Sequence, residues 1–226
     1  MFFPSPGLSR ALPHCGPTPR AGRGWPAAWA QPGFRGRLGL VGGLLLGLLG
    51  LAPPFYHFIQ ARPGHRLADP LLALLPVHDV SAPTFALIYG SVAAALVFLA
   101  PRPRLLLRGL WAYFLLQLLR MITLTLLPLE PPAALVVLHD PVVDNLFAAT
   151  RHSVVRDLFF SGHTATAALL ALAVRGRRWR LALALLTVVL GALVLVQRVH
   201  YSYDVLAAPF FAWLAYRLAG YVCRPR

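Results

Sequence analysis

Six long apolar runs, separated by shorter polar connections, dominate the chain. They lie at about 38–59, 83–100, 105–127, 158–174, 181–199 and 205–221. Each run is close to the roughly 17–25 residues that a helix needs to cross the hydrocarbon core of a bilayer. The pattern predicts an all-α, multi-pass integral membrane protein in which residues 37–222 form a bundle of six transmembrane helices.

The overall composition agrees with burial in a bilayer. Of the 226 residues, 58% are hydrophobic and only 12% are charged, and the mean hydropathy of +0.66 lies far above that of a soluble domain of this size. Residues 1–36 are instead rich in Pro, Gly and Arg without sustained periodicity, which predicts a disordered cytoplasmic tail. Residues 223–226 are expected to form a second, short cytoplasmic tail.

In a soluble protein, the net charge of +14 would suggest a nucleic-acid partner. The distribution of the charges along the chain distinguishes this explanation from membrane orientation. All 21 basic residues are arginine, and most of them fall on the cytoplasmic side if the N-terminus is cytoplasmic, while all 7 acids fall on the opposite side. This distribution follows the positive-inside rule and predicts that both termini are cytoplasmic. No basic stripe is interleaved with aromatic residues, so we expect no nucleic-acid partner.

The sequence Ser-Gly-His-Thr at residues 161–164 stands at the start of the fourth apolar run. A glycine lets the backbone approach a ligand closely, and the free N–H groups and positive dipole end of a helix N-terminus favour an anion. Ser161, Gly162 and Thr164 are therefore predicted to bind a phosphate, with His163 beside it. The alternative is an ordinary helix cap by Ser161, with His163 merely at the membrane interface.

His200 and Asp204 are separated by four residues. If the last helix begins near residue 199, the two side chains lie on one face, and Asp204 could accept the Nδ1 proton of His200 and leave Nε2 free as a nucleophile. The alternative is a structural hydrogen bond that secures a short hairpin. A second histidine, His163, on the same side of the membrane favours catalysis, because the two would supply a nucleophile and a separate acid.

Two arginines are candidates for charge stabilisation of a phosphate. Arg120 lies in the third apolar run near its outer end, where an arginine needs a carboxylate, backbone carbonyls or a ligand phosphate; the alternative is snorkelling to the interface. Arg156, beside Asp157 in a connection, is the second candidate and could equally be an ordinary loop residue. No pair of histidines in the polar connections has the i, i+4 spacing of metal ligands, and no cysteine lies near these histidines in the sequence. We therefore expect no metal and no cofactor.

The two histidine segments resemble motifs of the sphingomyelin synthase branch of the type 2 phosphatidic acid phosphatase superfamily. That branch has Ser-Gly-His-Thr and His-Tyr-(Ser/Thr)-x-Asp-Val, which are similar to residues 161–164 and 200–205. Asp157 also matches an aspartate of the branch, and Arg-Met-Ile-Thr at 120–123 is similar to its Arg-x-x-Thr stretch. An aspartate of its Pro-Leu-Pro-Asp loop corresponds to either Asp69 or Asp79. The Lys-x6-Arg-Pro motif of the phosphatases is absent, since the chain has no lysine.

The resemblance implies a catalytic triad of His163, His200 and Asp204, open to the non-cytoplasmic face. His200, oriented by Asp204, would attack the phosphorus of a glycerophospholipid donor, and His163 would protonate the departing alcohol. A ceramide-like acceptor would then take the phospho-head group from the phosphohistidine. Asp157 is a supporting residue, and the predicted phosphate-binding residues are Ser161, Gly162, Thr164, Arg120, Arg156 and Tyr201. A lipid phosphate phosphatase of the same superfamily is the first alternative, and a non-catalytic membrane scaffold or transporter is the second.

Overall fold

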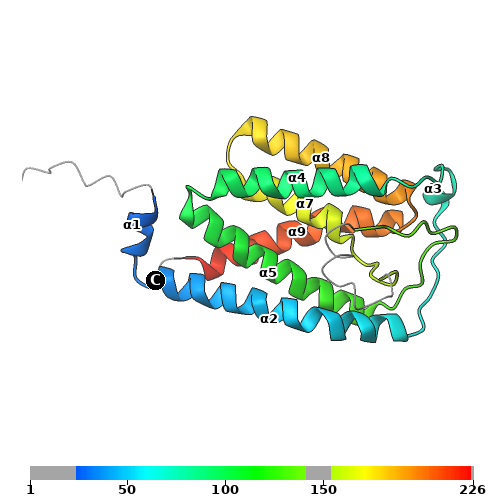
Figure 1. Cartoon of the computed structure of the whole chain (residues 1–226), viewed down its shortest axis with the longest axis horizontal. Coiled ribbons are helices and arrows are strands. Elements are labelled where there is room, and N and C mark those ends of the chain that lie inside the picture. Colours follow the sequence, from blue (N-terminus) through cyan, green and yellow to red (C-terminus); the bar gives the residue numbers. More distant parts are fainter. Residues whose placement is uncertain (1–23, 141–153, 225–226) are drawn as a thin grey trace, which may run out of the picture.

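The computed structural model describes residues 24–140 and 154–224, which form a bundle of nearly aligned helices (Figure 1). No strand occurs within these ranges. The helices are α1 (Trp25–Trp29), α2 (Phe34–Ala61), α3 (Pro70–Ala73), α4 (Ser81–Leu99), α5 (Pro103–Leu126), α7 (Gly162–Ala173), α8 (Arg177–Val196) and α9 (Ser202–Val222).

Five helices, α2, α4, α5, α8 and α9, are long and apolar enough to cross a membrane. They coincide with five of the six predicted apolar runs, so the all-helical class of the described residues is confirmed and a polytopic membrane protein is supported. The remaining run, 158–174, is helical only over the 12 residues of α7. At about 1.5 Å per residue, α7 is roughly 18 Å long, against about 30 Å of hydrocarbon. The number of six spans and the cytoplasmic placement of the termini stay predictions.

The short helix α7 occupies the middle of the bundle. It contacts α4, α5, α8 and α9, and its buried face is built largely from alanines such as Ala165 and Ala168, opposite Ala208 and Ala212 of α9. Small side chains let membrane helices approach closely, which is how helices associate where lipid removes the hydrophobic driving force. The helix α7 is therefore packed against four neighbouring helices.

The residues just before α7 are apolar but not helical. Phe160 is fully buried and its ring stacks on that of Phe211 in α9, with 4.2 Å between ring centroids. The carbonyl of Phe159 accepts a hydrogen bond from the Thr123 hydroxyl of α5, at 3.2 Å. These contacts hold residues 159 and 160 in a non-helical bend just before Ser161, and α7 therefore begins later than the apolar run.

The two ends of the bundle differ in charge. The connections between α2 and α4 and between α5 and α7 meet the α8–α9 hairpin at one end, shown at the right of Figure 1, and all of the described acidic residues lie in these connections or at the start of α9. The arginine-rich segments 102–108 and 175–180 lie at the opposite end together with α1. There the indole N–H of Trp25 donates to the carbonyl of Ala100, at 2.8 Å. We call the two ends the acidic end and the arginine end.

The predicted N-terminal tail lies partly outside the described residues. Residues 1–23 are not described, whereas Trp25–Trp29 forms α1 and α2 begins at Phe34. The helical part of the chain thus starts before the predicted boundary at residue 37. The rings of Trp25, Trp29 and Phe34 pack together in tilted and edge-to-face arrangements. These aromatic contacts stabilise a segment whose Pro and Gly content predicted disorder.

Candidate active site

The N-terminus of α7 lies at the acidic end and is joined to the start of α9. The backbone N–H of Ser161 donates to the carbonyl of Asp204, at 3.2 Å, and the Ser161 hydroxyl accepts a hydrogen bond from that of Thr164, at 3.1 Å. Ser161 makes no side-chain capping bond to the described part of α7, which argues against the ordinary cap considered as an alternative. The first N–H groups of α7 are therefore left for another acceptor.

The guanidinium of Arg120 packs directly against this helix N-terminus. A Cβ atom placed on Gly162 would lie 3.0 Å from Cζ of Arg120 and 3.3 Å from its Nε and Nη1. Glycine at this position therefore allows the positive charge to sit beside the free N–H groups of α7. A guanidinium and a helix N-terminus both favour an anion, and here they act on the same point in space.

Arg120 is buried, with 5% of its surface exposed, so it does not snorkel to the interface. Its Nη2 lies 2.7 Å from Oδ1 of Asp157 and donates to the Asp157 carbonyl, at 3.2 Å. Tyr56 lines the same cavity as Arg120. The buried Nη1 of Arg120 has no hydrogen-bond partner in the part of the chain that the structure describes. A ligand phosphate could satisfy this donor.

His200 and Asp204 lie together, although in a different setting from the predicted one. The helix α9 begins at Ser202 with Tyr201 as its N-cap, so His200 precedes the helix. The distance from His200 Nδ1 to Asp204 Oδ2 is 3.6 Å, which is an ion-pair distance and not a hydrogen bond. Oδ2 of Asp204 accepts the backbone N–H of Tyr201, at 2.9 Å, as part of a capping box. Asp204 thus both caps α9 and faces the imidazole.

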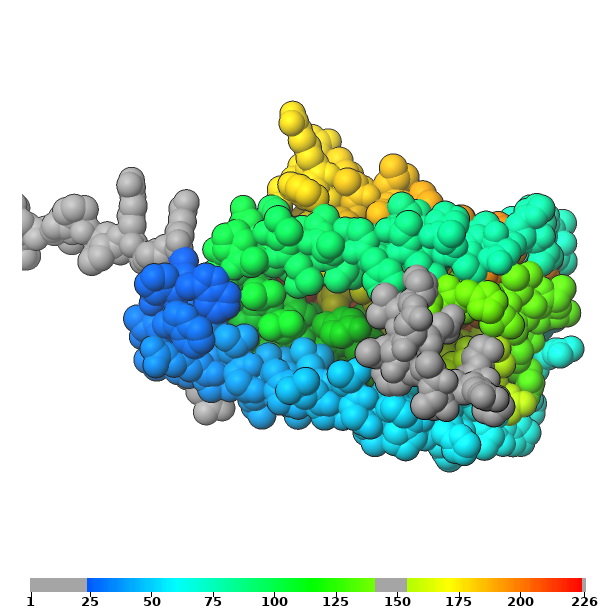
Figure 2. Space-filling model, in the orientation of Figure 1, coloured from blue at the N-terminus to red at the C-terminus, as the bar shows by residue number. Residues whose placement is uncertain are grey.

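His163 and His200 line one cavity of about 480 Å³, which Gly162, Arg120 and Asp157 also line. The cavity lies between α4, α5 and α7, and Figure 2 shows the surface hollowed between α4 and α2. The His163 ring packs edge-on against Phe85 of α4, with 5.6 Å between centroids. The volume falls within the range of about 300–1,000 Å³ that is usual for small-molecule pockets. Both imidazoles are therefore accessible from one ligand-sized space.

Arg156 does not reach this cavity. Its Nη2 pairs with Glu130, at 2.8 Å, and its Nη1 donates to the backbone carbonyls of Gln60 and Arg62. Its backbone N–H donates to the side chain of Gln60, at 2.8 Å. These contacts tie the connection before α7 to the end of α2. Arg156 therefore has structural partners among the described residues, and its predicted contact with phosphate stays a prediction.

Tyr201 also has other partners. Its hydroxyl donates to the carbonyl of Glu130, at 2.9 Å, and accepts the backbone N–H of Leu67, at 3.2 Å. The side chain is 1% exposed and is absent from the described lining of the cavity. Ser161 and Thr164 are likewise buried behind the lining. Of the predicted phosphate-binding residues, Gly162 and Arg120 are the two that reach the cavity.

Asp69 is placed to hold the start of α9. Its carboxylate accepts the backbone N–H of Ser202, at 2.6 Å, and the Ser202 hydroxyl, at 3.0 Å, and it also caps α3 through the N–H of Leu72, at 3.0 Å. Burial raises the pKa of Asp69, but the hydrogen bonds from Ser202 and Leu72 outweigh it and lower the pKa below the usual range. Asp79 instead bonds Ser81. Asp69 is therefore the one of the two candidate aspartates that contacts α9.

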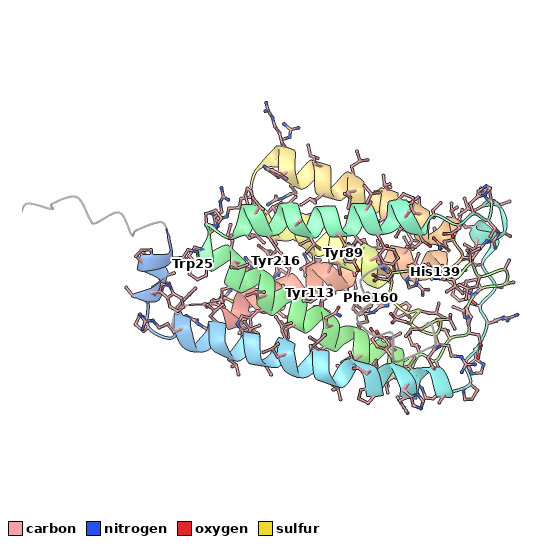
Figure 3. The ribbon with its side chains drawn as sticks, in the orientation of Figure 1. Trp25, Tyr89, Tyr113, His139, Phe160 and Tyr216 are labelled. Atoms are coloured by element: carbon pink, nitrogen blue, oxygen red, sulfur yellow. The ribbon has the colours of Figure 1, made fainter. Side chains whose placement is uncertain are left out.

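Several polar residues line the cavity that the sequence interpretation did not single out. They are Tyr56, Tyr89, Tyr113, Gln117 and Asp140. The Tyr89 hydroxyl donates to Asp140, at 2.6 Å, and Figure 3 shows Tyr89 and Tyr113 in the region of α4 and α5. Polar side chains within apolar runs are uncommon and usually face a bundle interior or cavity. Four of these five residues lie inside the predicted spans, so a polar side chain within an apolar run was the sequence signal that could have identified them.

Within residues 24–140 and 154–224, no group of three His, Cys, Asp or Glu side chains that could hold a metal ion is found. The site offers instead two imidazoles, a buried guanidinium and a helix N-terminus around one cavity. This combination suits a phosphate ester whose phosphorus is attacked by one imidazole and whose leaving-group oxygen is protonated by the other.

Comparison with known proteins agrees with this chemistry. Residues 156–221 match the family described as PAP2 superfamily C-terminal, a segment that contains α7, α8, all but the last residue of α9 and both histidine motifs. No match was found among curated proteins or among solved structures. The match supports a place for the chain in the PAP2 superfamily, whose members are phosphatases or phosphotransferases.

Proposed function

We propose that the protein is a membrane enzyme that transfers a phospho-head group from a glycerophospholipid to a lipid alcohol such as ceramide, through a phosphohistidine. The observation that carries the proposal is that His163 and His200 line the same cavity as Arg120 and the first residue of α7. A phosphate held by Arg120 and the α7 N-terminus lies between a nucleophile and an acid. Such preorganised donors are usually the largest single contribution to catalysis of this kind.

In the first step, Nε2 of His200 attacks phosphorus while its Nδ1 keeps a proton and faces Asp204. A P–N bond forms and the bond from phosphorus to the diacylglycerol oxygen breaks, with His163 giving its proton to that oxygen. Asp204 stabilises the positive imidazole ring of the intermediate. The 3.6 Å separation of His200 and Asp204 would shorten as that charge develops, because catalytic hydrogen bonds are often long before the ligand binds.

In the second step, His163 accepts the proton of the acceptor hydroxyl, whose oxygen attacks phosphorus. The P–N bond breaks, the new phospholipid leaves, and both histidines return to their starting protonation states. With water in place of the lipid alcohol, the same steps would give a lipid phosphate phosphatase, which is the second candidate. The absence of lysine, and hence of the phosphatase Lys-x6-Arg-Pro motif, favours transfer.

Lipid substrates are favoured by the walls of the cavity. Side chains of candidate spans, including Ile88 and Val92 of α4, line it together with the histidines. A phosphate at Arg120 would therefore have apolar protein surface next to its alkyl groups. A soluble phosphomonoester would make no use of that surface.

The test is an assay of purified protein with labelled phosphatidylcholine or phosphatidylethanolamine plus ceramide. Transfer gives a new phosphosphingolipid, whereas a phosphatase releases inorganic phosphate from a phosphomonoester. His200→Ala should abolish either activity, and His78→Ala is the matched control, because His78 is exposed and is not in the described lining of the cavity. Turnover by the His200 variant at the parent rate would overturn the proposal.

A further inference from the structure

A row of polar side chains on α5 continues the cavity away from the phosphate position. Tyr113, Gln117 and Arg120 are spaced by four and three residues, which places them on one face of the helix, and all of them line the cavity. Along the helix axis, Gln117 lies about 4.5 Å and Tyr113 about 10 Å from Arg120 toward the arginine end. A ligand with its phosphate at Arg120 would therefore extend past Gln117.

The amide of Gln117 is available to such a ligand. Gln117 lies inside a candidate span, yet no side chain or backbone group of the described residues hydrogen-bonds its amide. It also lines a second, smaller cavity of about 40 Å³ between α2 and α5. An amide in apolar surroundings is unfavourable unless it finds a partner. The Tyr113 hydroxyl, one turn further along, likewise has no hydrogen-bond partner in the described part of the chain.

A lipid carries a hydrogen-bonding group at the corresponding place. In a diacyl phospholipid the ester carbonyls follow the phosphate by a few covalent bonds, or roughly 5 Å, and in a ceramide the amide is similarly close to the hydroxyl that would accept phosphorus. Gln117 has both a donor and an acceptor, and Tyr113 has a hydroxyl. A donor NH₂ suits an ester carbonyl, and the full amide suits another amide.

We propose that Gln117, assisted by Tyr113, binds the carbonyl group in the linkage region of a lipid substrate and so determines which lipids are used. This inference rests on the proposed function, because that function fixes the phosphate at Arg120. The carbonyl has two sources, the ester of the donor and the amide of the acceptor. An ether-linked lipid has neither and serves as the reference ligand.

The experiment compares the parent protein with Gln117→Leu, which replaces the amide by an apolar side chain and so removes its hydrogen bonds. In the donor arm, kcat/KM is measured for diacyl and for dialkyl phosphatidylcholine; in the acceptor arm, for ceramide and for a dialkylglycerol. In the arm whose carbonyl Gln117 binds, we expect the ratio of kcat/KM for the carbonyl-containing lipid to kcat/KM for the ether-linked lipid to fall about two- to twelvefold in the variant. This is the effect of losing one hydrogen bond. Leu118→Gln is the control, because Leu118 is exposed and lies outside the described lining.

A binding measurement separates this inference from the proposed function. In the His200→Ala background, competition between diacyl and dialkyl phosphatidylcholine, and between ceramide and dialkylglycerol, gives the same preferences without turnover. A preference that Gln117→Leu reduces in either pair supports the inference even if the proposed reaction is wrong. If Gln117→Leu leaves both preferences as they are in the parent, or the parent shows none, the inference is overturned.

Discussion

The close approach of Arg120 to Gly162 makes Gly162→Ala a sharp test of the phosphate site. The added methyl group would lie 3.0 Å from Cζ of Arg120 and 3.3 Å from Nε and Nη1, closer than carbon and nitrogen atoms normally pack. The guanidinium therefore has to move by a few tenths of an ångström or more. It is held on its other side by Asp157, at 2.7 Å, so the movement changes its position relative to the α7 N-terminus.

The expected effect is on activity more than on stability. Alanine favours a helix over glycine by roughly 1 kcal/mol, which offsets part of the steric repulsion. Complete loss of one donor to a developing anion reduces kcat by about 10²- to 10³-fold, and displacement by about 1 Å can reduce it by about 10². A smaller displacement of Arg120 should therefore reduce kcat/KM for lipid transfer by about 10- to 100-fold.

The assay is kcat/KM for transfer together with the thermal unfolding temperature in the same detergent. Gly109→Ala is the matched control, since its Cβ would meet Leu99 at 3.8 Å and Ala173 at 3.9 Å, which is ordinary contact. Parent activity in Gly162→Ala would refute the placement of phosphate between Arg120 and α7. A fall in activity that follows a fall in unfolding temperature would show that the glycine serves packing alone.

Two other substitutions test how the site is supported. Gly191→Ala should lower the unfolding temperature, corresponding to about 1–3 kcal/mol of overpacking, because its Cβ would lie 2.7 Å from Cγ1 of Val205 in α9; a variant as stable as the parent would contradict the α8–α9 packing. Asp69 has a pKa below its usual range, so its contribution to stability is fully present above the unfolded pKa of about 3.9 and is lost as pH falls through the folded pKa. Asp69→Asn should therefore lower stability at neutral pH and reduce its loss in acid, measured as unfolding temperature against pH; an unchanged profile would contradict the contacts to Ser202.

Most of the helices could be located from the sequence, because a helix that can cross a bilayer appears there as a long apolar run. The runs at 38–59 and 181–199 coincide with α2 and α8 within a few residues. The fourth run was predicted too long because Phe159 and Phe160 are as apolar as a membrane span and yet form a non-helical bend that packs against α5 and α9. Hydropathy alone does not distinguish a buried non-helical segment from a helix.

The candidate site was predictable where its residues are neighbours in a single sequence motif. Gly162 and His163 are neighbours in sequence at a helix start, so their meeting at one cavity required little tertiary information. The contact of Arg120 with Gly162 joins α5 to α7, and spacing along the chain does not predict contacts between side chains of separate helices. The partners of Arg156 and Tyr201 lie in distant connections, Gln60 and Leu67 among them, and no local pattern indicates where such side chains point.

Asp204 has a second role, the capping of α9, that its spacing from His200 did not predict. The separation of four residues from His200 predicted a contact on one helix face, but α9 begins at Ser202, after the histidine. Asp204 is thereby the third residue of the helix and accepts the N–H of Tyr201. Because α9 begins at Ser202, the Asp204 carboxylate contacts both the Tyr201 N–H and the His200 ring. Sequence patterns define such helix boundaries poorly.

The central claim is that His200 takes the phospho-head group while His163 moves the proton, and trapping the intermediate tests it most directly. Purified protein is incubated with the glycerophospholipid donor without acceptor, quenched at alkaline pH, digested and analysed by mass spectrometry. The account predicts a phospho-head group on the peptide that contains His200, absent from His200→Ala and discharged when ceramide is added. Turnover with the group on another residue, or with no modified His200 under conditions that preserve phosphohistidine, would contradict it.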